Sequence, residues 1–395
     1  MAKKITVIGG SGFVGTNLCR QLSLKQQNFE IIDLRTSNQF PEKCKIADVR
    51  DVDSLRAAIT GDVVVNLAAV HRDDVRDKSE YQRTNVDGAE NVAQVCSEKG
   101  IKKIVFTSTV AVYGFAEPGT DESGKINPFN EYGSTKFEAE EKLRSWNEAS
   151  DNSLLIVRPT VIFGEGNRGN VYNLLNQIAS GKFLMVGRGE NKKSMAYIGN
   201  IVAFLETCIA SDRKYGLFNY VDTPDFTMNE LVSQVRHTLK GKNGVGPRLP
   251  YWLGMILGYV ADGVAKLTGK NLPVSSIRVT KFASSTKLQT HAQEQNSAQV
   301  RADEFRGIMC QEIASLVNEG LDGRPNLAAL DYASSALRRM ERLSWDVERE
   351  RRLYDRYLGE ARAQRRKALR AWCAFNSGGN RNSRNELKSH ERVGT

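Results

Sequence analysis

Cysteine is scarce in this chain, and its six cysteines form no CxxC pair. They stand at positions 19, 44, 96, 208, 310 and 373. This spacing suits neither zinc nor an iron–sulfur cluster, so we expect no metal site. Scattered single thiols are typical of a reducing compartment and not of a disulfide-stabilised secreted protein.

Long apolar runs are also missing. No run approaches the roughly 20 residues that a membrane-spanning helix needs, and the uncharged segment Leu249–Ala261 has only 13. The N-terminus, MAKKITVIGG, passes from two lysines straight into a short apolar run and glycines. It has neither the hydrophobic region nor the cleavage site of a signal peptide. We therefore expect a cytoplasmic protein.

The composition is that of an ordinary globular protein, with 395 residues, 40% hydrophobic and 26% charged. This excludes disorder throughout and a collagen-like fibre. Lysine and arginine outnumber the acids by 56 to 46, but residues 291–395 hold 17 of the arginines and only two lysines. Acids are interspersed among these arginines, which favours a solvated helix face, and we expect no nucleic-acid partner.

The chemistry begins with a glycine pattern near the N-terminus. Residues 3–8 predict a short buried strand that runs directly into GGSGFVG and the helical pattern TNLCRQLS. Gly9, Gly12 and Gly15 thus lie at a strand-to-helix turn. Such a turn lets the backbone approach a pyrophosphate closely and directs a helix N-terminus at its charge.

A second predicted strand, Phe29–Leu34, contains Asp33. Its carboxylate lies at the position where a dinucleotide site accepts hydrogen bonds from the adenosine ribose. Because this charge would repel a 2′-phosphate, we expect NAD and not NADP as the cofactor.

Strand and helix patterns continue to alternate after this point. Val63–Ala68 and Ile104–Ser108 predict strands, with a helix over Asn91–Lys99 between them. The alternation predicts an α/β fold with a Rossmann-type, doubly wound parallel sheet. Further candidates for contact with the cofactor in this segment are Asp48, Val49, Ala68 and Ala69.

A YxxxK spacing supplies candidate catalytic residues. Tyr132 and Lys136 would lie on neighbouring turns of one helix, where the ammonium can stabilise a phenolate. Thr109 follows the predicted strand at Ile104–Ser108. A chain of this composition contains about 0.7 YxxxK matches by chance, so its place after the glycine turn and after TSTVAVYG carries the prediction.

Taken with NLAA, Asn85 in TNVDGAENV, FTSTVAVYG, YGSTK and Arg158-Pro159, these motifs resemble the extended short-chain dehydrogenases/reductases, the NAD-dependent epimerase/dehydratase family. The resemblance implies that Thr109 binds the reacting hydroxyl, that Tyr132 is the general base and that Lys136 tunes Tyr132 and holds the nicotinamide ribose. Val110-Ala111 replaces the Asp-Glu pair of the family's dehydratases, which disfavours dehydration. The further cofactor contacts that the resemblance implies are Phe13, Val14, Asn85 and Pro159.

Later strings, among them HRDDV, RPTVIFGEGNRGNVYNLLNQI and GRGENKKSMAYIGN, are similar to bacterial 4-epimerases acting on N-acetylglucosamine linked through diphosphate to undecaprenol. This implies a transient 4-keto sugar, no net oxidation and a role in surface polysaccharide (O-antigen) synthesis. A UDP-sugar 4-epimerase, a 4-keto-sugar nucleotide reductase and a catalytically impaired scaffold are the alternatives. The candidate substrate-binding residues are Asn167, Arg168, Asn170, Lys193, Tyr197 and Arg278.

The resemblance ends near Leu288. We expect a NAD-binding domain over residues 1–160, a substrate-binding region over 161–288 with some strands returning to the first domain, a helical extension over 289–375 and a disordered tail over 376–395. Leu249–Leu267 is either a core helix or an interfacial helix for peripheral membrane contact. We also expect a homodimer, located at the cytoplasmic face of the inner membrane.

Overall fold

The computed structural model describes residues 3–72, 75–167, 169–181, 183–268, 275–285 and 287–290. Apart from residues 289 and 290, the predicted helical extension and disordered tail lie outside the described residues. The chain divides into two compact units. Of the described residues, the first unit contains those up to Asn170, then Val186–Met228 and those from Leu249 to Thr290, whereas Val171–Met185 and Asn229–Arg248 belong to the second.

A seven-stranded parallel sheet forms the centre of the first unit. The strand order is β10-β6-β5-β4-β1-β2-β3. The order reverses between β1 and β4, which is where doubly wound folds bind their ligands. The strands are β1 (Ile5–Ile8), β2 (Phe29–Asp33), β3 (Cys44–Ile46), β4 (Val63–Asn66), β5 (Lys103–Thr107), β6 (Ser153–Pro159) and β10 (Tyr215–Tyr220).

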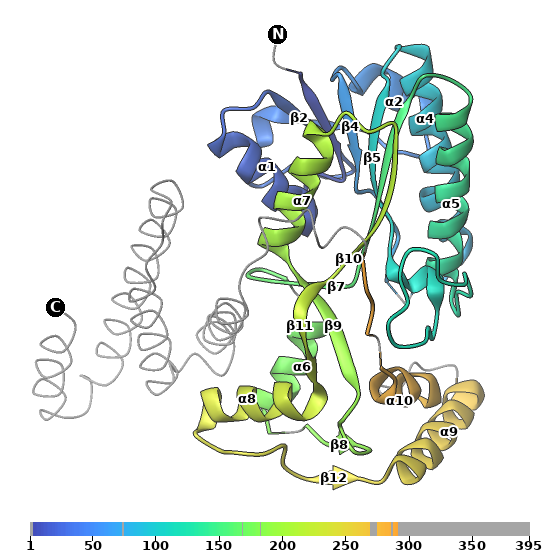
Figure 1. The fold of residues 1–395 in the computed structure, drawn as a ribbon. Helices are drawn as coiled ribbons and strands as arrows, with labels where there is room; N and C mark the ends of the chain where they lie inside the picture. The colour runs from blue at the N-terminus through green and yellow to red at the C-terminus, as the bar shows by residue number, and fades with distance from the viewer. Residues whose placement is uncertain are drawn as a thin grey trace, which may run out of the picture. The chain divides into compact units, whose positions relative to one another are not determined.

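Helices cover both faces of this sheet (Figure 1). On one face, Ile8, Val64 and Phe106 belong to a core with residues of α2 (Val52–Ala58), α4 (Gly88–Glu98) and α5 (Glu131–Glu148). On the other, Val7 and Val105 pack with residues of α1 (Phe13–Leu24) and α7 (Ile198–Ala210). Successive side chains of a strand point to opposite faces, so the inner strands β1, β2, β4, β5 and β6 contribute to both cores. The predicted Rossmann-type fold is confirmed.

The connections between strands and helices contain several short elements. These are the 3₁₀ turns η1 (Pro41–Lys43) and η3 (Val110–Tyr113), the short helix α3 (Ser79–Tyr81) and a π-helical turn η2 (Gln82–Asp87) that leads into α4. π-helical turns are rare and are frequent at functional sites. The segment from α3 to η2 also carries Asn85, one of the candidate cofactor residues.

Two smaller sheets and four more helices complete the described residues. β7 (Val161–Phe163), β9 (Lys192–Tyr197) and β11 (Asp222–Thr227) form a three-stranded sheet in the first unit. α9 (Tyr251–Thr268) and α10 (Ser276–Ala283) pack on each other (Figure 1). The second unit holds most of α6 (Asn170–Ala179) and α8 (Met228–Lys240), and β8 (Met185–Val186) pairs with β12 (Arg248–Leu249).

Candidate active site

The turn between β1 and α1 leaves no room for side chains at its glycines. Gly9 has a φ of +79°, and a Cβ there would lie 2.9 Å from the backbone nitrogen of Ala68. A Cβ on Gly15 would lie 2.5 Å from the Cα atom of Gly10. Both positions therefore require glycine.

The N-terminus of α1 follows this turn without a side-chain cap. Gly12 is the N-cap residue, and Phe13 and Val14 begin the helix. Because the first backbone N–H groups of a helix have no intrahelical acceptor, this end of α1 suits an anion such as a pyrophosphate. The structure therefore places the predicted glycine pattern, Phe13 and Val14 together at one uncapped helix N-terminus.

Asp33 ends β2 and connects this strand to the glycine turn. Its Oδ2 accepts a hydrogen bond from the backbone N–H of Ser11 at 3.0 Å, and its Oδ1 accepts one from the N–H of Arg35 at 3.2 Å. Each carboxylate oxygen retains a second lone pair. Asp33 is thus oriented beside the turn and can accept further hydrogen bonds from a ribose.

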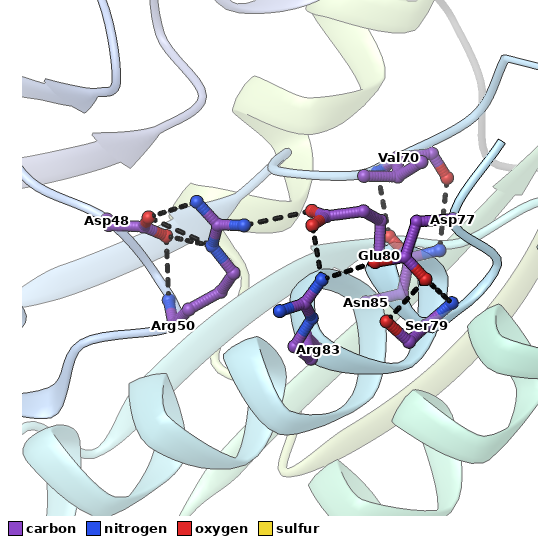
Figure 2. A network of polar contacts seen from close by, with 8 residues as sticks. All are labelled: Asp48, Arg50, Val70, Asp77, Ser79, Glu80, Arg83 and Asn85. Carbon is purple, nitrogen blue, oxygen red and sulfur yellow. Dashed lines mark hydrogen bonds and ion pairs between the residues drawn. The ribbon is translucent and has the colours of Figure 1, made fainter. Parts of the chain in front are cut away.

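Asp48 and Val49 form a loop after β3, and neighbouring residues fix both of them. Arg50 Nε lies 3.0 Å and 2.9 Å from the two carboxylate oxygens of Asp48 (Figure 2). This hydrogen bonding from Arg50 lowers the pKa of Asp48. The backbone oxygen of Val49 accepts a hydrogen bond from Asn91 Nδ2 at 2.9 Å. The loop is therefore held in one conformation at the carboxyl edge of the sheet.

Asn85 orients the loop that follows β4. Its Oδ1 accepts a hydrogen bond from the N–H of Val70 at 2.8 Å, and its Nδ2 donates to the carbonyl oxygen of Val70 at 3.1 Å (Figure 2). Nδ2 also lies 3.0 Å from the hydroxyl of Thr135, the residue before Lys136. Asn85 thus couples the loop with Ala68 and Ala69 to the helix that carries Tyr132 and Lys136.

Thr109 and Tyr132 lie in contact although 23 residues separate them in the sequence. α5 begins at Glu131 because Asn130 caps it, with a hydrogen bond of 2.9 Å from the N–H of Gly133 to Asn130 Oδ1. This places Tyr132 in the first turn of α5. Its side chain forms a hydrogen bond with the side chain of Thr109, so the two hydroxyls lie at one place.

Burial changes the acidity of Tyr132 and Lys136. The pKa of Tyr132 is raised because burial disfavours the phenolate, and the hydrogen bond with Thr109 only partly opposes this effect. The pKa of Lys136 is lowered to about 7 because burial disfavours the ammonium, against the opposing charge of Glu140. The protein alone therefore does not favour the phenolate and ammonium pair, and a bound ligand must help to stabilise it.

The environment of Lys136 is the strongest indication that this site binds a ligand. Its Nζ is buried, lies 4.0 Å from the centre of the Phe106 ring and has no hydrogen-bond partner among the described residues. The hydroxyls of Thr107 and Ser108, at the end of β5, share this lack of a partner. Buried polar groups are normally satisfied, so ribose hydroxyls here would complete the site. Together with the glycine turn and Asp33, these residues fit a dinucleotide.

The structure contains a buried ion pair, between Arg158 and Glu140, that we did not predict from the sequence. Arg158 Nε donates to Glu140 Oε1 at 2.8 Å, and Arg158 Nη1 donates to the hydroxyl of Tyr113 at 2.6 Å. Pro159, a predicted cofactor contact, directly follows Arg158 and ends β6. Glu140 follows Lys136 by one helical turn on α5, but nothing in the sequence indicates that Arg158 is its partner.

Two of the candidate substrate residues, Asn167 and Lys193, form side-chain hydrogen bonds to backbone carbonyl groups. Asn167 Nδ2 donates to the carbonyl oxygen of Ile162 at 2.7 Å. The ammonium of Lys193 donates to the carbonyl oxygens of Lys281 and Ser284, at 2.8 and 2.6 Å, at the C-terminal end of α10. Burial lowers the pKa of Lys193 to about 8. Both contacts are those of a loop or helix cap, and the assignment of these two side chains to the substrate stays a prediction.

The other substrate candidates are more dispersed. Tyr197 is the N-cap of α7, and its backbone N–H donates to the buried carboxylate of Asp222 at 2.5 Å. Asn170 begins α6, and Arg278 is an exposed residue of α10. Arg168 lies outside the described residues. These assignments stay predictions.

Comparison with known proteins adds to this geometry. Residues 5–219, more than half of the chain, match the model of the NAD dependent epimerase/dehydratase family. The chain belongs to this family. The predicted family, enzyme class and cofactor NAD are therefore confirmed. Within the described residues, no helix is both long and apolar enough to cross a membrane.

Two curated relatives and one solved structure illustrate the relationship. The N-acetyl-alpha-D-glucosaminyl-diphospho-ditrans,octacis-undecaprenol 4-epimerase of Escherichia coli O157:H7 is 50% identical over 73% of this chain and 87% of its own. The UDP-glucose 4-epimerase of Vibrio cholerae is 29% identical over 68% of this chain and 86% of its own. The structure of MoeE5 in complex with UDP-glucose and NAD has a TM-score of 0.60 at 21% identity, over 78% of this chain and 97% of its own, which supports the fold alone.

Proposed function

We propose that this protein interconverts N-acetylglucosamine and N-acetylgalactosamine on a diphosphate carrier by inverting carbon 4, and that the carrier is undecaprenyl diphosphate. The observation that carries the proposal is the hydrogen-bonded pair of Thr109 and Tyr132 next to the unsatisfied ammonium of Lys136. The 50% identity to the Escherichia coli 4-epimerase supports the choice of sugar and carrier.

In this proposal the catalytic residues are Thr109, Tyr132 and Lys136. Thr109 holds the carbon-4 hydroxyl, and Tyr132 as a phenolate accepts its proton. Lys136 holds the nicotinamide ribose, and its charge stabilises that phenolate. Bound NAD⁺ supplies the hydride acceptor, and later the donor, that makes a transient oxidation at carbon 4 redox-neutral. The 4-keto sugar then rotates so that carbon 4 is reduced on its opposite face, and Tyr132 returns the proton to the carbon-4 oxygen.

The proposed lipid carrier gives a role to α9. Apolar side chains are exposed along this helix, including Trp252, Ile256, Tyr259 and Val260. Its buried residues are glycines, and a Cβ on Gly258 would lie 2.8 Å from the backbone of Ser276 at the start of α10. The glycine face therefore packs on α10, and we propose that the apolar face lies in the headgroup region of a membrane.

Two further parts of the proposal rest on the family resemblance. We propose a homodimer, located at the cytoplasmic face of the inner membrane, where a lipid-linked sugar would be available to α9. Gel filtration with light scattering tests the first part and fractionation of cells tests the second.

A pair of substrates tests the function. The protein is incubated with undecaprenyl-diphosphate-linked and with UDP-linked N-acetylglucosamine, and the galacto epimer is measured in each. We expect conversion of the lipid-linked sugar. Tyr132→Phe should reduce it at least about a hundredfold, because the general base is lost, yet leave the NAD content unchanged. Tyr215→Phe, a change at an exposed tyrosine of β10, is the matched control.

The outcomes of this assay separate the alternatives. More than a few per cent of activity in Tyr132→Phe would contradict the assigned base. Conversion of the UDP-linked sugar alone would favour a UDP-sugar 4-epimerase. The 29% identity to the Vibrio cholerae enzyme supports this alternative. Conversion of neither sugar would leave the 4-keto-sugar nucleotide reductase and the impaired scaffold, and consumption of added NADH would favour the reductase.

A further inference from the structure

A network of ion pairs joins the loop after β3 to the helical segment that follows β4 (Figure 2). We call it the Arg50 network. Arg50 stands at its centre, between the carboxylates of Asp48 and Glu80. The members of the Arg50 network are Asp48, Arg50, Asp77, Glu80 and Arg83.

The distances in the Arg50 network are those of strong, charge-assisted contacts. Arg50 Nη2 lies 2.6 Å from Asp48 Oδ2, and Arg50 Nη1 lies 2.9 Å from Glu80 Oε2. Arg83 Nη2 lies 2.5 Å from Glu80 Oε1 and 2.8 Å from Asp77 Oδ2. Glu80 thus bridges Arg50 and Arg83. The guanidinium of Arg50 binds Asp48 through Nε and Nη2 and binds Glu80 through Nη1.

The backbone of the Asp48 and Val49 loop has its own anchors. The N–H of Asp48 donates to Ser54 Oγ at 3.2 Å, and the Val49 carbonyl accepts from Asn91. Gly88, at the start of α4, leaves room for the Val49 side chain, because a Cβ there would lie 2.8 Å from Val49 Cγ2. These anchors fix the backbone, whereas Arg50 determines where the Asp48 carboxylate points.

The other end of the network leads to the second side of the cofactor site. Glu80 belongs to α3, and the π-helical turn η2 with Asn85 follows directly. Asn85 holds Val70 and contacts Thr135 beside Lys136. The network therefore connects the loop after β3 with the loop after β4 and with α5.

We propose that Arg50 and Glu80 are positioning residues that hold the Asp48 and Val49 loop in its NAD-binding conformation and thereby slow the release of NAD. The proposal rests on the assignment of Asp48 and Val49 to the adenine. An epimerase that oxidises and then reduces the same sugar must keep its cofactor between the two steps, so slow release is a requirement of the chemistry. Isolated surface ion pairs contribute little, but a bidentate arginine within a network is the exception.

The test measures the dissociation of NAD from the full-length protein and needs no sugar. Protein loaded with radiolabelled NAD is chased with excess unlabelled NAD. We expect Glu80→Gln and Arg50→Gln each to accelerate dissociation by about threefold to tenfold. The affinity for ADP-ribose should fall by a similar factor. In the double variant the two effects should not multiply, because both remove the same contact.

Glu98→Gln is the matched control. It removes an ion pair with Arg56 between α2 and α4, whose side chains are 40% and 36% exposed, against 36% and 30% for Arg50 and Glu80. We expect no change in NAD dissociation for this variant, and similar urea midpoints for all variants without NAD. These midpoints separate a local effect on the loop from general destabilisation.

Unchanged dissociation in both Arg50→Gln and Glu80→Gln would overturn the proposal, as would an equal acceleration in Glu98→Gln. Asp48→Asn separates the proposal from its premise. If this variant releases NAD faster while the Arg50 and Glu80 variants do not, the adenine assignment stands and the positioning role fails. If none of the variants changes dissociation, the adenine assignment fails as well.

Discussion

At the scale of a single residue, Lys136 shows how a ligand-binding site lowers the folding stability of the free protein. Its ammonium is buried without an acceptor, and burial lowers its pKa to about 7 from an ordinary value of 10.5. The unfolded chain therefore binds more protons than the folded one between these values. The cost to folding is complete below about pH 7 and disappears as the pH rises toward 10.5.

This leads to a prediction for Lys136→Met. In protein freed of NAD, the variant should be more stable than the parent by a few kcal/mol near pH 6 and by less at pH 9, because the penalty for a buried cation is removed. It should also lose activity. Urea unfolding at the two pH values measures the effect.

Lys193→Met is the control for this experiment. The ammonium of Lys193 is also buried, but it donates to two carbonyl oxygens at the end of α10. Removing it relieves the burial cost that lowers the pKa of Lys193 to about 8, but it leaves those carbonyls without their donor, so we expect a smaller gain in stability than for Lys136→Met. A gain in Lys193→Met as large as in Lys136→Met would contradict the reasoning on unsatisfied charge.

Local patterns predicted several residues of the site, whereas long-range contacts escaped prediction. The spacing of Tyr132 and Lys136 on one helix follows from helical geometry alone. The contact of Arg158 with Glu140, and that of Lys193 with the end of α10, depend on tertiary packing. No periodicity in the sequence indicates which distant carbonyl or carboxylate a lysine or arginine will meet.

At the scale of elements, the β1–α1–β2 unit was the most predictable part. The predicted strands agree with β1 and β2 to within two residues at each end, and the helical pattern TNLCRQLS lies within α1, which begins three residues earlier. β3 was not predicted because it has three residues of mixed polarity. The π-helical turn η2 was not predicted either, since it lies within a continuous helical pattern and differs only in its hydrogen bonding.

α9 carries the prediction that belongs to this scale. Trp252 and Tyr259 are each 63% exposed, whereas Gly254 and Gly258 are buried. We expect the protein to float with liposomes that contain anionic lipid, and Trp252→Glu with Ile256→Glu to abolish this, because two charges would enter the headgroup region. Leu24→Glu with Leu184→Glu, two exposed apolar residues elsewhere, should leave flotation unchanged. Equal flotation of both double variants would refute the interfacial helix.

At the scale of the whole molecule, the net charge of +10 agrees with the proposed action on an anionic diphosphate at an anionic membrane surface. Within the described residues, the first unit extends to residue 290. Leu288 is buried against Val112 and Tyr113, and Thr290 Oγ1 donates to Glu122 at 2.7 Å. The chain therefore remains part of this unit where the family resemblance ends. This connection depends on tertiary packing, which is why the sequence pattern did not indicate it.

The central claim is that carbon 4 is inverted by oxidation and reduction with the same hydrogen. Undecaprenyl-diphosphate-linked N-acetylglucosamine that carries deuterium at carbon 4 tests this claim most directly, with mass spectrometry of the sugar after incubation with the protein. The account predicts an N-acetylgalactosamine product that keeps its deuterium at carbon 4. Loss of the deuterium to water during conversion, or the absence of conversion, would contradict it.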